Sequence, residues 1–341
     1  MQKILLGYVR SSASLSKEDV CRLTHIQLAF GRLRSDGSIH TDGVSALISQ
    51  MPQLRAWNPD LRISLSLIPD AGDTAAFTRV CADHALRLAF AESCVRAVED
   101  LHLDGVDLDW EFPCVPYYGA EASPQDRDHF TETLRILRKA LDQLPGPHRL
   151  LTIASGADVY YTRCVDLPAI SREVDFINVM TYDLRCGFHA LTGHHTPLYT
   201  NACDFFQNSC DQALRLFAAC GVPREKLLLG AAFYSRKWEN IPDRRHGLLV
   251  PAKSGAAYGP MWDELEKHYL NQNGYVYYWD DEAKAPYLFN GSTFLTFDDP
   301  ASLREKCRYV LKEGYGGIFY WEHSCDSTGR LLGTLYACLK D

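Results

Sequence analysis

The feature that most constrains the fold of this chain is a regular alternation between short apolar runs and amphipathic helical stretches. Eight runs have the length and composition of buried strands: Ile4–Val9, His25–Phe30, Arg62–Ile68, Leu103–Trp110, Leu150–Ser155, Asp175–Met180, Leu227–Phe233 and Gly316–Trp321. Strands that alternate with helices along a chain form parallel sheets. Eight such units suggest a sheet that closes on itself, so we expect an α/β fold of the (β/α)8 TIM-barrel type.

Three stretches between these runs carry the apolar spacing of helices. They are Arg127–Leu144, Asp204–Cys220 and Pro300–Glu313. Glycine follows each of them closely, in two cases together with proline, as is typical of the point where a helix ends. The sequence therefore predicts helices at these three places.

One connection is much longer than the others. Roughly 65 residues separate the seventh run from the helix at Pro300, and a structureless loop of that length is uncommon. Its middle is rich in aromatic, strand-like segments, and Asn290-Gly291 is a hairpin signal. We predict a small α+β subdomain at 236–297, inserted into a barrel made of residues 1–235 and 298–341. The insertion follows strand seven on the side of a barrel where active sites are built.

The charge balance limits the partners of the chain. It has 35 Lys and Arg against 43 Asp and Glu, a formal net charge of -8. Nucleic acids and anionic membranes attract clustered basic residues, so we expect neither as a partner. No apolar run approaches the ~18 residues of a membrane span. The first strand follows Lys3 without a signal-peptide core, so we expect a cytoplasmic protein. A secreted chain whose leader had been removed would look the same.

The cysteines and histidines give little sign of metal binding. The 12 cysteines are scattered singly along the chain without a C-x-x-C pair, whereas structural zinc sites need paired ligands at short spacing. The chain is also far longer than a disulfide-stapled scaffold. The adjacent pair His194-His195 would diverge on an extended segment. We therefore predict reduced, mostly buried thiols, a structural loop at the histidines and no metal site.

The most informative segment is the acidic strand Asp104–Glu111. Because side chains alternate faces in a strand, Asp107, Asp109 and Glu111 share one side. Three acids that point into a barrel disfavour one another's ionisation, so at least one should hold a proton. Glu111 is the outermost, at the end of the strand where barrel enzymes carry out catalysis. A carboxyl kept protonated near neutral pH is what a general acid requires.

Two other interpretations of this strand are less favoured. A half-exposed strand with a solvated acidic face would not stand fourth among eight apolar runs. A calcium loop needs a turn glycine near its sixth position and polar residues between its ligands. Val106, Leu108 and Trp110 occupy the intervening positions instead.

The same segment resembles a known signature. Asp104–Glu111 reads D-G-x-D-x-D-x-E, the pattern of family 18 glycoside hydrolases, the chitinase family. Further segments resemble that family in the same order along the chain: Asn178–Asp183 with its M-x-Y-D pattern, Thr192–Tyr199, Phe297–Pro300 and Gly316–Trp321. The inserted subdomain is similar to the one in the deep-cleft branch of the family. The resemblance therefore covers nearly the whole chain.

The resemblance implies a role for each of the strand acids. Glu111 would protonate the glycosidic oxygen, and the substrate's own 2-acetamido carbonyl would be the nucleophile, giving an oxazolinium intermediate. Asp109 would hydrogen-bond the acetamido N–H and stabilise positive charge. Asp107 would tune Asp109 from behind. Asp104 has the wrong parity for this cluster and is expected to be structural.

Other residues would bind the sugar. The resemblance implies that Tyr182 holds the acetamido oxygen, that Asp183 contacts the sugar from the opposite wall and that Trp321 forms an apolar floor, with Met180 in the same segment as Tyr182. Flat aromatic faces suit sugars, and the stacking candidates are Tyr8, Phe30, Phe188 and Trp238. Tyr234, at the end of strand seven, is expected to line the cleft.

The sequence departs from the family pattern at three places. Ser66-Leu67-Ile68-Pro69 lacks two glycines that are common after strand three, Phe112 replaces a common tyrosine, and Arg185–Phe188 replaces a stretch that often carries tryptophan. None of these changes removes the proposed acid. They leave the number of sugar subsites open.

The resemblance implies a retaining, substrate-assisted hydrolase of β-1,4-linked N-acetylglucosamine in chitin or chito-oligosaccharides. Its partner would be such a saccharide, and it would need no cofactor. A non-catalytic chitinase-like lectin is the alternative from another class, although such lectins generally lose the acid that Glu111 supplies. Endo-N-acetylglucosaminidase and peptidoglycan-lytic activities also stay open.

Overall fold

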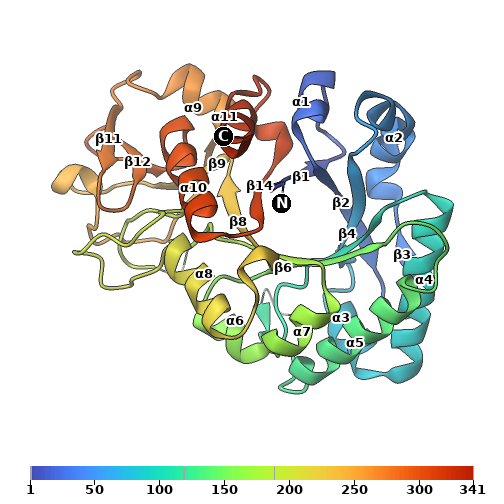
Figure 1. The fold of residues 1–341 in the computed structure, drawn as a ribbon. Helices are drawn as coiled ribbons and strands as arrows, with labels where there is room; N and C mark the ends of the chain where they lie inside the picture. The colour runs from blue at the N-terminus through green and yellow to red at the C-terminus, as the bar shows by residue number, and fades with distance from the viewer. Residues whose placement is uncertain (1, 118–119, 188, 341) are drawn as a thin grey trace.

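Eight parallel strands form a closed barrel in the computed structural model, which describes residues 2–117, 120–187 and 189–340 (Figure 1). The barrel strands are β1 (Ile4–Arg10), β2 (His25–Leu33), β4 (Arg62–Pro69), β5 (Gly105–Leu108), β6 (Leu150–Ser155), β7 (Phe176–Val179), β8 (Leu227–Ala232) and β14 (Gly317–Trp321). They lie in chain order, and β1 closes the barrel by pairing with both β14 and β2. Each predicted run overlaps one of these strands, so the (β/α)8 prediction is confirmed.

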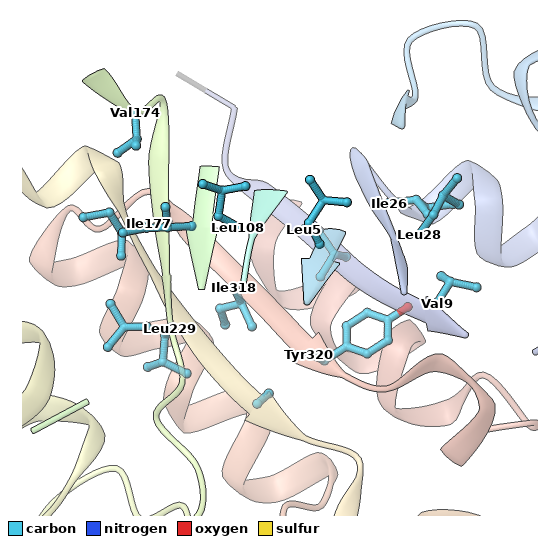
Figure 2. Packing of buried hydrophobic residues seen from close by; sticks show 14 of the residues in the cluster. Leu5, Val9, Ile26, Leu28, Leu108, Val174, Ile177, Leu229, Ile318 and Tyr320 are labelled. Carbon is cyan, nitrogen blue, oxygen red and sulfur yellow. The ribbon is translucent and has the colours of Figure 1, made fainter. Parts of the chain in front are cut away.

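Alternation along the strands divides the apolar residues into two layers. Every second side chain along a strand, such as Leu5 and Val9 of β1, packs outward between the sheet and the helices (Figure 2). The intervening residues, such as Leu6 and Tyr8, form a second cluster within the barrel. The same parity sends Leu108 outward and Asp107 inward, which is why a strand can carry acids without exposing its core.

Helices surround the barrel between the strands. They are α1 (Lys17–Arg22), α2 (Ser45–Trp57), α3 (Ala76–Ala82), α4 (His84–Asp100), α5 (Asp126–Leu141), α6 (Val159–Cys164), α7 (Leu167–Glu173), α8 (Cys210–Ala219), α10 (Pro300–Glu313) and α11 (Arg330–Lys340). In the part of the chain that the structure describes, no helix combines the length and apolar character needed to cross a membrane.

Local capping explains where the predicted helices start and end. α10 has the predicted bounds, because Asp299 and Ser302 form a capping box, Pro300 occupies the first turn and Gly314 ends the helix at a φ of 78°. The helix predicted over 127–144 ends at Leu141. The one predicted over 204–220 starts only at Cys210, where the Ser209 side chain accepts a hydrogen bond from the backbone of Gln212.

A five-stranded antiparallel sheet follows β8. Its order is β10 (Ala257–Met261), β9 (Tyr234–Trp238), β13 (Phe294–Thr296), β12 (Ala285–Phe289) and β11 (Val276–Asp280), and α9 (Trp262–His268) accompanies it. The turn at Asn290-Gly291 joins β12 to β13, with Gly291 at a φ of 94°. Figure 1 shows this insertion, in orange, beside the barrel. The predicted α+β subdomain after strand seven is therefore present.

The cysteines are less buried than the sequence suggested. All 12 lie in the described ranges as free thiols, and five of them are buried: Cys81, Cys94, Cys210, Cys307 and Cys325. Of the other seven, Cys21 and Cys203 are exposed and five are partly buried. The prediction that most thiols are buried was wrong.

Candidate active site

Asp107 lies inside the barrel at the centre of a hydrogen-bond cluster. Its carboxylate accepts hydrogen bonds from Tyr8 Oη at 2.9 Å, Ser66 Oγ at 2.7 Å, Thr152 Oγ1 at 2.6 Å and Asn178 Nδ2 at 3.3 Å. These donors come from β1, β4, β6 and β7, so four other strands converge on one carboxylate. Burial raises the pKa of Asp107, while the hydrogen bonds lower it and so partly offset the effect of burial.

Asp109 follows the strand on the same side. It is 6% exposed, and its Oδ1 is buried without a hydrogen-bond partner among the described residues. Burial, together with the charges of Glu111 and Asp107, raises the pKa of Asp109 well above its usual range. Asp109 can therefore hold a proton at a pH where an ordinary aspartate is ionised, and one of its oxygens is free for a ligand.

Glu111 is the outermost acid of the three. Its side chain is open to solvent, although protein atoms crowd around the carboxyl group. Burial among these atoms, with a smaller contribution from the charge of Asp183, raises the pKa of Glu111 to about 7. A carboxyl group with that pKa can both give up and take back a proton near neutral pH.

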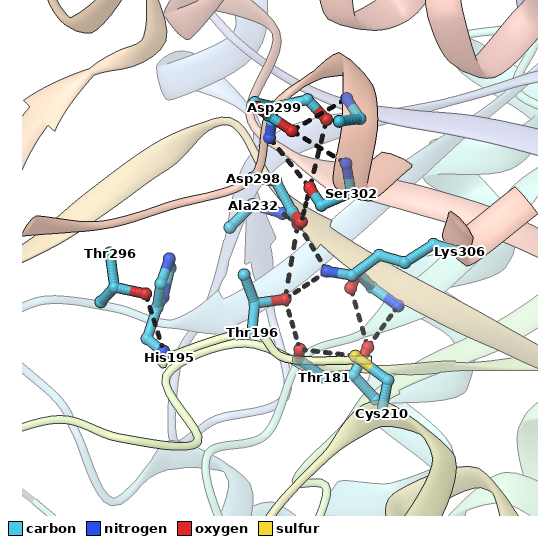
Figure 3. A network of polar contacts seen from close by, with 12 residues as sticks. Thr181, His195, Thr196, Cys210, Ala232, Thr296, Asp298, Asp299, Ser302 and Lys306 are labelled. Carbon is cyan, nitrogen blue, oxygen red and sulfur yellow. Dashed lines mark hydrogen bonds and ion pairs between the residues drawn. The ribbon is translucent and has the colours of Figure 1, made fainter. Parts of the chain in front are cut away.

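Tyr182 and Asp183 follow shortly after the end of β7 at Val179, and hydrogen bonds of Thr181 hold this segment in place. The Thr181 hydroxyl donates to the Gly230 carbonyl at 2.8 Å, and Thr196 Oγ1 donates to the Thr181 carbonyl at 2.8 Å (Figure 3). Burial and the charges of Asp109 and Glu111 raise the pKa of Tyr182 well above its usual range. Tyr182 therefore keeps its hydroxyl proton and lies near both acids.

Asp183 is held by two basic side chains. Arg236 of β9 contacts both carboxylate oxygens, with Nε 2.6 Å from Oδ1, and His195 Nδ1 lies 3.4 Å from Oδ1. Burial opposes ionisation of Asp183, but the hydrogen bonds and charge of Arg236, together with the nearby His195 ring, outweigh it and keep the pKa well below its usual range. Asp183 is thus a fixed negative charge close to Glu111.

Aromatic rings line the inner side of the same strands. Trp321 stacks on Phe30 with 5.5 Å between ring centroids, and it lies 5.9 Å from the ring of Tyr8. Phe319 contacts Tyr8 and Tyr182 edge to face. Phe30, Met180, Tyr182 and Trp321 are only partly buried and pack on this inner cluster. The site thus combines acids on and after β5 with an apolar surface on β1, β2 and β14.

The family model of glycosyl hydrolases family 18 matches residues 4–326 of this chain. The chain belongs to this family. The resemblance read from the sequence motifs is therefore confirmed over nearly the whole length.

Relatives and solved structures agree with this family 18 assignment. Chitinase A1 of Niallia circulans is 35% identical over 318 residues, which are 87% of this chain and 45% of that protein. Chitotriosidase-1 of Mus musculus is 29% identical, over 87% of this chain and 66% of that protein. The chain thus spans about half to two thirds of the length of these relatives.

Among solved structures, a family 18 N-acetylglucosaminidase from Paenibacillus barengoltzii superposes with a TM-score of 0.95. It is 45% identical, over 98% of this chain and 99% of that one. Chitinase ChiW from Paenibacillus sp. str. FPU-7 gives a TM-score of 0.91 at 34% identity, over 99% of this chain and 43% of that one.

Two of the predicted sugar-binding aromatic residues are placed where they cannot stack on a sugar. Tyr8 is 2% exposed, and its hydroxyl serves Asp107 instead. Trp238 is 1% exposed and packs against Phe294 in the core of the small sheet. Tyr234 is also buried, in edge contact with Tyr182 and His195. Phe188 lies outside the described residues.

The acids of the predicted strand lie on the faces that their parity predicts. Asp107, Asp109 and Glu111 share one side, while Asp104 binds Arg55 and Arg62 below the barrel cluster and is structural, as predicted. Within the described ranges no three His, Cys, Asp or Glu side chains are grouped so as to hold a metal ion.

Sequence reasoning missed Arg236 and the role of His195. The sequence did hold a signal for Arg236. It is the one basic residue on a face of the strand that otherwise carries the aromatic residues Tyr234 and Trp238. His194, the other histidine of the pair, binds Asp280 of the small sheet at 3.1 Å. The two histidines thus diverge, one toward the site and one toward the insertion.

Proposed function

We propose that this chain hydrolyses β-1,4-linked N-acetylglucosamine oligosaccharides with retention of configuration. The observation that carries the proposal is the row of three carboxyl groups on and after β5, of which the outermost, Glu111, has a pKa of about 7. The neighbouring Asp109 has a buried oxygen without a partner, which suits the N–H group of an acetamide. Membership of glycosyl hydrolases family 18 supports the same chemistry.

In the proposed first step, Glu111 gives its proton to the glycosidic oxygen as the bond from that oxygen to the anomeric carbon breaks. The carbonyl oxygen of the substrate's 2-acetamido group forms a new bond to the same carbon, which yields an oxazolinium ion and a free sugar alcohol. Asp109 accepts a hydrogen bond from the acetamido N–H through its unpartnered oxygen, which orients the group and disperses the positive charge as it forms. Tyr182, which keeps its proton, donates to the acetamido oxygen.

In the second step, water attacks the anomeric carbon from the face that the leaving group vacated. Glu111, now ionised, takes a proton from that water, and the acetamido oxygen leaves the anomeric carbon. The product has the configuration of the substrate, and the acid is restored. Trp321, with Phe30 stacked on it, offers an apolar surface beneath the reacting sugar.

We further propose that short, soluble oligosaccharides are the substrates. One solved structure that matches this chain over 98% of its length, at 45% identity, is that of an N-acetylglucosaminidase. Chitinases among the relatives support the same linkage and sugar. A lectin would bind the same saccharides without turnover, but the complete set of three acids favours the enzyme.

The test is turnover of N-acetylglucosamine oligomers of two to six units, beside an N-glycopeptide and peptidoglycan, with product anomers followed by NMR. We expect the β-anomer to form first from the oligomers. Glu111→Gln should lower kcat by roughly 10²-fold or more while oligomers still bind, and Glu121→Gln, an acid of the same loop paired with Arg79, should not. An unimpaired Glu111→Gln variant, or binding without any turnover by the wild type, would overturn the proposal.

A further inference from the structure

Tyr258, on the edge strand of the inserted sheet, is an aromatic side chain that the interior of the protein does not need. It is 67% exposed, whereas Tyr234 and Trp238 on the neighbouring strand are buried. An exposed aromatic ring beside a catalytic site needs an explanation, because burial of such a ring is strongly favourable.

The register of the sheet places Tyr258 next to the catalytic residues. It is the cross-strand partner of Arg236, so both side chains lie on the same face. The Arg236 guanidinium lies over the Tyr258 ring, 3.8 Å from its centroid. Because Arg236 also holds Asp183 through both carboxylate oxygens, a chain of direct contacts joins Tyr258 to the segment that carries Tyr182.

The backbone around Tyr258 is built to hold the ring in this place. The register of β10 against β9 shifts between Tyr258 and Met261, as at a β-bulge. Gly259 lets the two strands approach closely, since a Cβ atom there would lie 2.3 Å from Ser235 Oγ. The Tyr234 ring lies 5.7 Å away, measured between ring centroids. Arg236 therefore covers one face of the Tyr258 ring, and the rest of the side chain is open to solvent.

Electrostatics agrees that Tyr258 lies close to the acids. Burial raises the pKa of Tyr258, and the charges of Asp183 and Glu111 raise it further against the opposing effect of Arg236. The hydroxyl therefore stays protonated, and it lies within electrostatic reach of the proposed acid.

From this geometry we propose that Tyr258 binds the sugar unit next to the cleaved bond, with its open ring face against the apolar face of an N-acetylglucosamine pyranose. This rests on the proposed function. The ring fixed on Arg236 would then be a specificity residue that favours oligosaccharides over the smallest substrates. It takes no part in the proton transfers of Glu111.

The test compares Tyr258→Ala and Tyr258→Phe with the wild type on N-acetylglucosamine oligomers of two to five units. Loss of the ring should raise KM for the longer oligomers roughly 3- to 10-fold, with kcat and its pH profile unchanged. Tyr258→Phe keeps the ring and should keep KM close to the wild type. Val276→Ala is the matched control, because Val276 is an exposed apolar side chain, 48% exposed, on the opposite edge of the same sheet.

Two results would overturn the proposal. One is an unchanged KM for every oligomer in Tyr258→Ala. The other is a lower kcat with a shifted pH profile at constant KM, which would make Tyr258 only a brace for Arg236. Failure of the proposed function is distinguishable, because it is read from the wild type. Should the wild type bind oligomers without turnover, calorimetric affinities of wild type and Tyr258→Ala for the tetramer still test the role of Tyr258.

Discussion

Lys306 of α10 and Asp298 form an ion pair with both side chains completely excluded from solvent, and the Nζ–Oδ2 distance is 2.6 Å. Lys306 also donates to Thr196 Oγ1 at 2.5 Å, and Thr196 in turn donates to the Thr181 carbonyl (Figure 3). Thr181 directly precedes Tyr182. The buried pair therefore ties an outer helix to the segment that carries part of the site.

Replacement of Lys306 by methionine should destabilise the protein strongly, because it leaves the Asp298 charge buried without its partner. We expect a loss of about 3–5 kcal/mol in the free energy of unfolding, measured by guanidinium denaturation at pH 7. The double variant Lys306→Met/Asp298→Leu removes both charges and should recover part of that loss. A single variant as stable as the wild type would show that the pair contributes little.

The activity should depend on pH through Glu111. The acid must be protonated to act, and its pKa in the free enzyme is about 7. We therefore expect Glu111 to leave kcat/KM unaffected below that pH, where it is protonated. Above that pH, kcat/KM should fall about tenfold per pH unit. Oligosaccharide turnover measured between pH 4 and 10 checks this. A plateau that extends past pH 9 would contradict the assignment of Glu111.

Asp183→Asn should move the alkaline fall in kcat/KM to lower pH. The negative charge of Asp183 raises the pKa of Glu111, so its removal, with Arg236 left unpaired, makes Glu111 easier to ionise. Asp211→Asn, which removes a partly buried acid paired with Arg215 on α8, is the control and should leave the pH dependence in place. A shift toward higher pH in Asp183→Asn would contradict the charge relationship.

Tyr8→Phe should lower both stability and turnover. The variant removes the hydroxyl that donates to Asp107 and accepts from Asn178 inside the barrel, and loss of a buried hydrogen bond to a charged group costs about 1.5–3 kcal/mol. Tyr320→Phe is the control, since that hydroxyl bonds His323 away from the acids. Urea denaturation measures the loss of stability in each variant, and kcat should fall only in Tyr8→Phe. Equal kcat in both would mean that Asp107 does not influence the reaction.

Sequence periodicity was enough to predict the strands and the side of the strand on which the acids lie. A period of two fixes which face Asp107 and Asp109 take, and the eight apolar runs fix the closure of the barrel. Periodicity does not name the neighbours across the barrel. The donors to Asp107 come from four strands that are far apart in the sequence, as Tyr8 and Asn178 are. Only the closed sheet brings them together. The start of α8 was missed because a serine cap outweighed the apolar spacing before it.

The error at Trp238 leads to a last prediction. Its parity matches Tyr234 and Arg236, but Ile241 and Val250 join Trp238 in a separate core cluster that covers this end of the face. The indole of Trp238 packs inside this cluster, so Trp238→Phe should leave KM for oligosaccharides unchanged. The lost packing should lower the free energy of unfolding by roughly 1–3 kcal/mol. Steady-state kinetics on the tetramer and thermal unfolding measure the two effects. A raised KM at unchanged stability would restore Trp238 as a sugar contact.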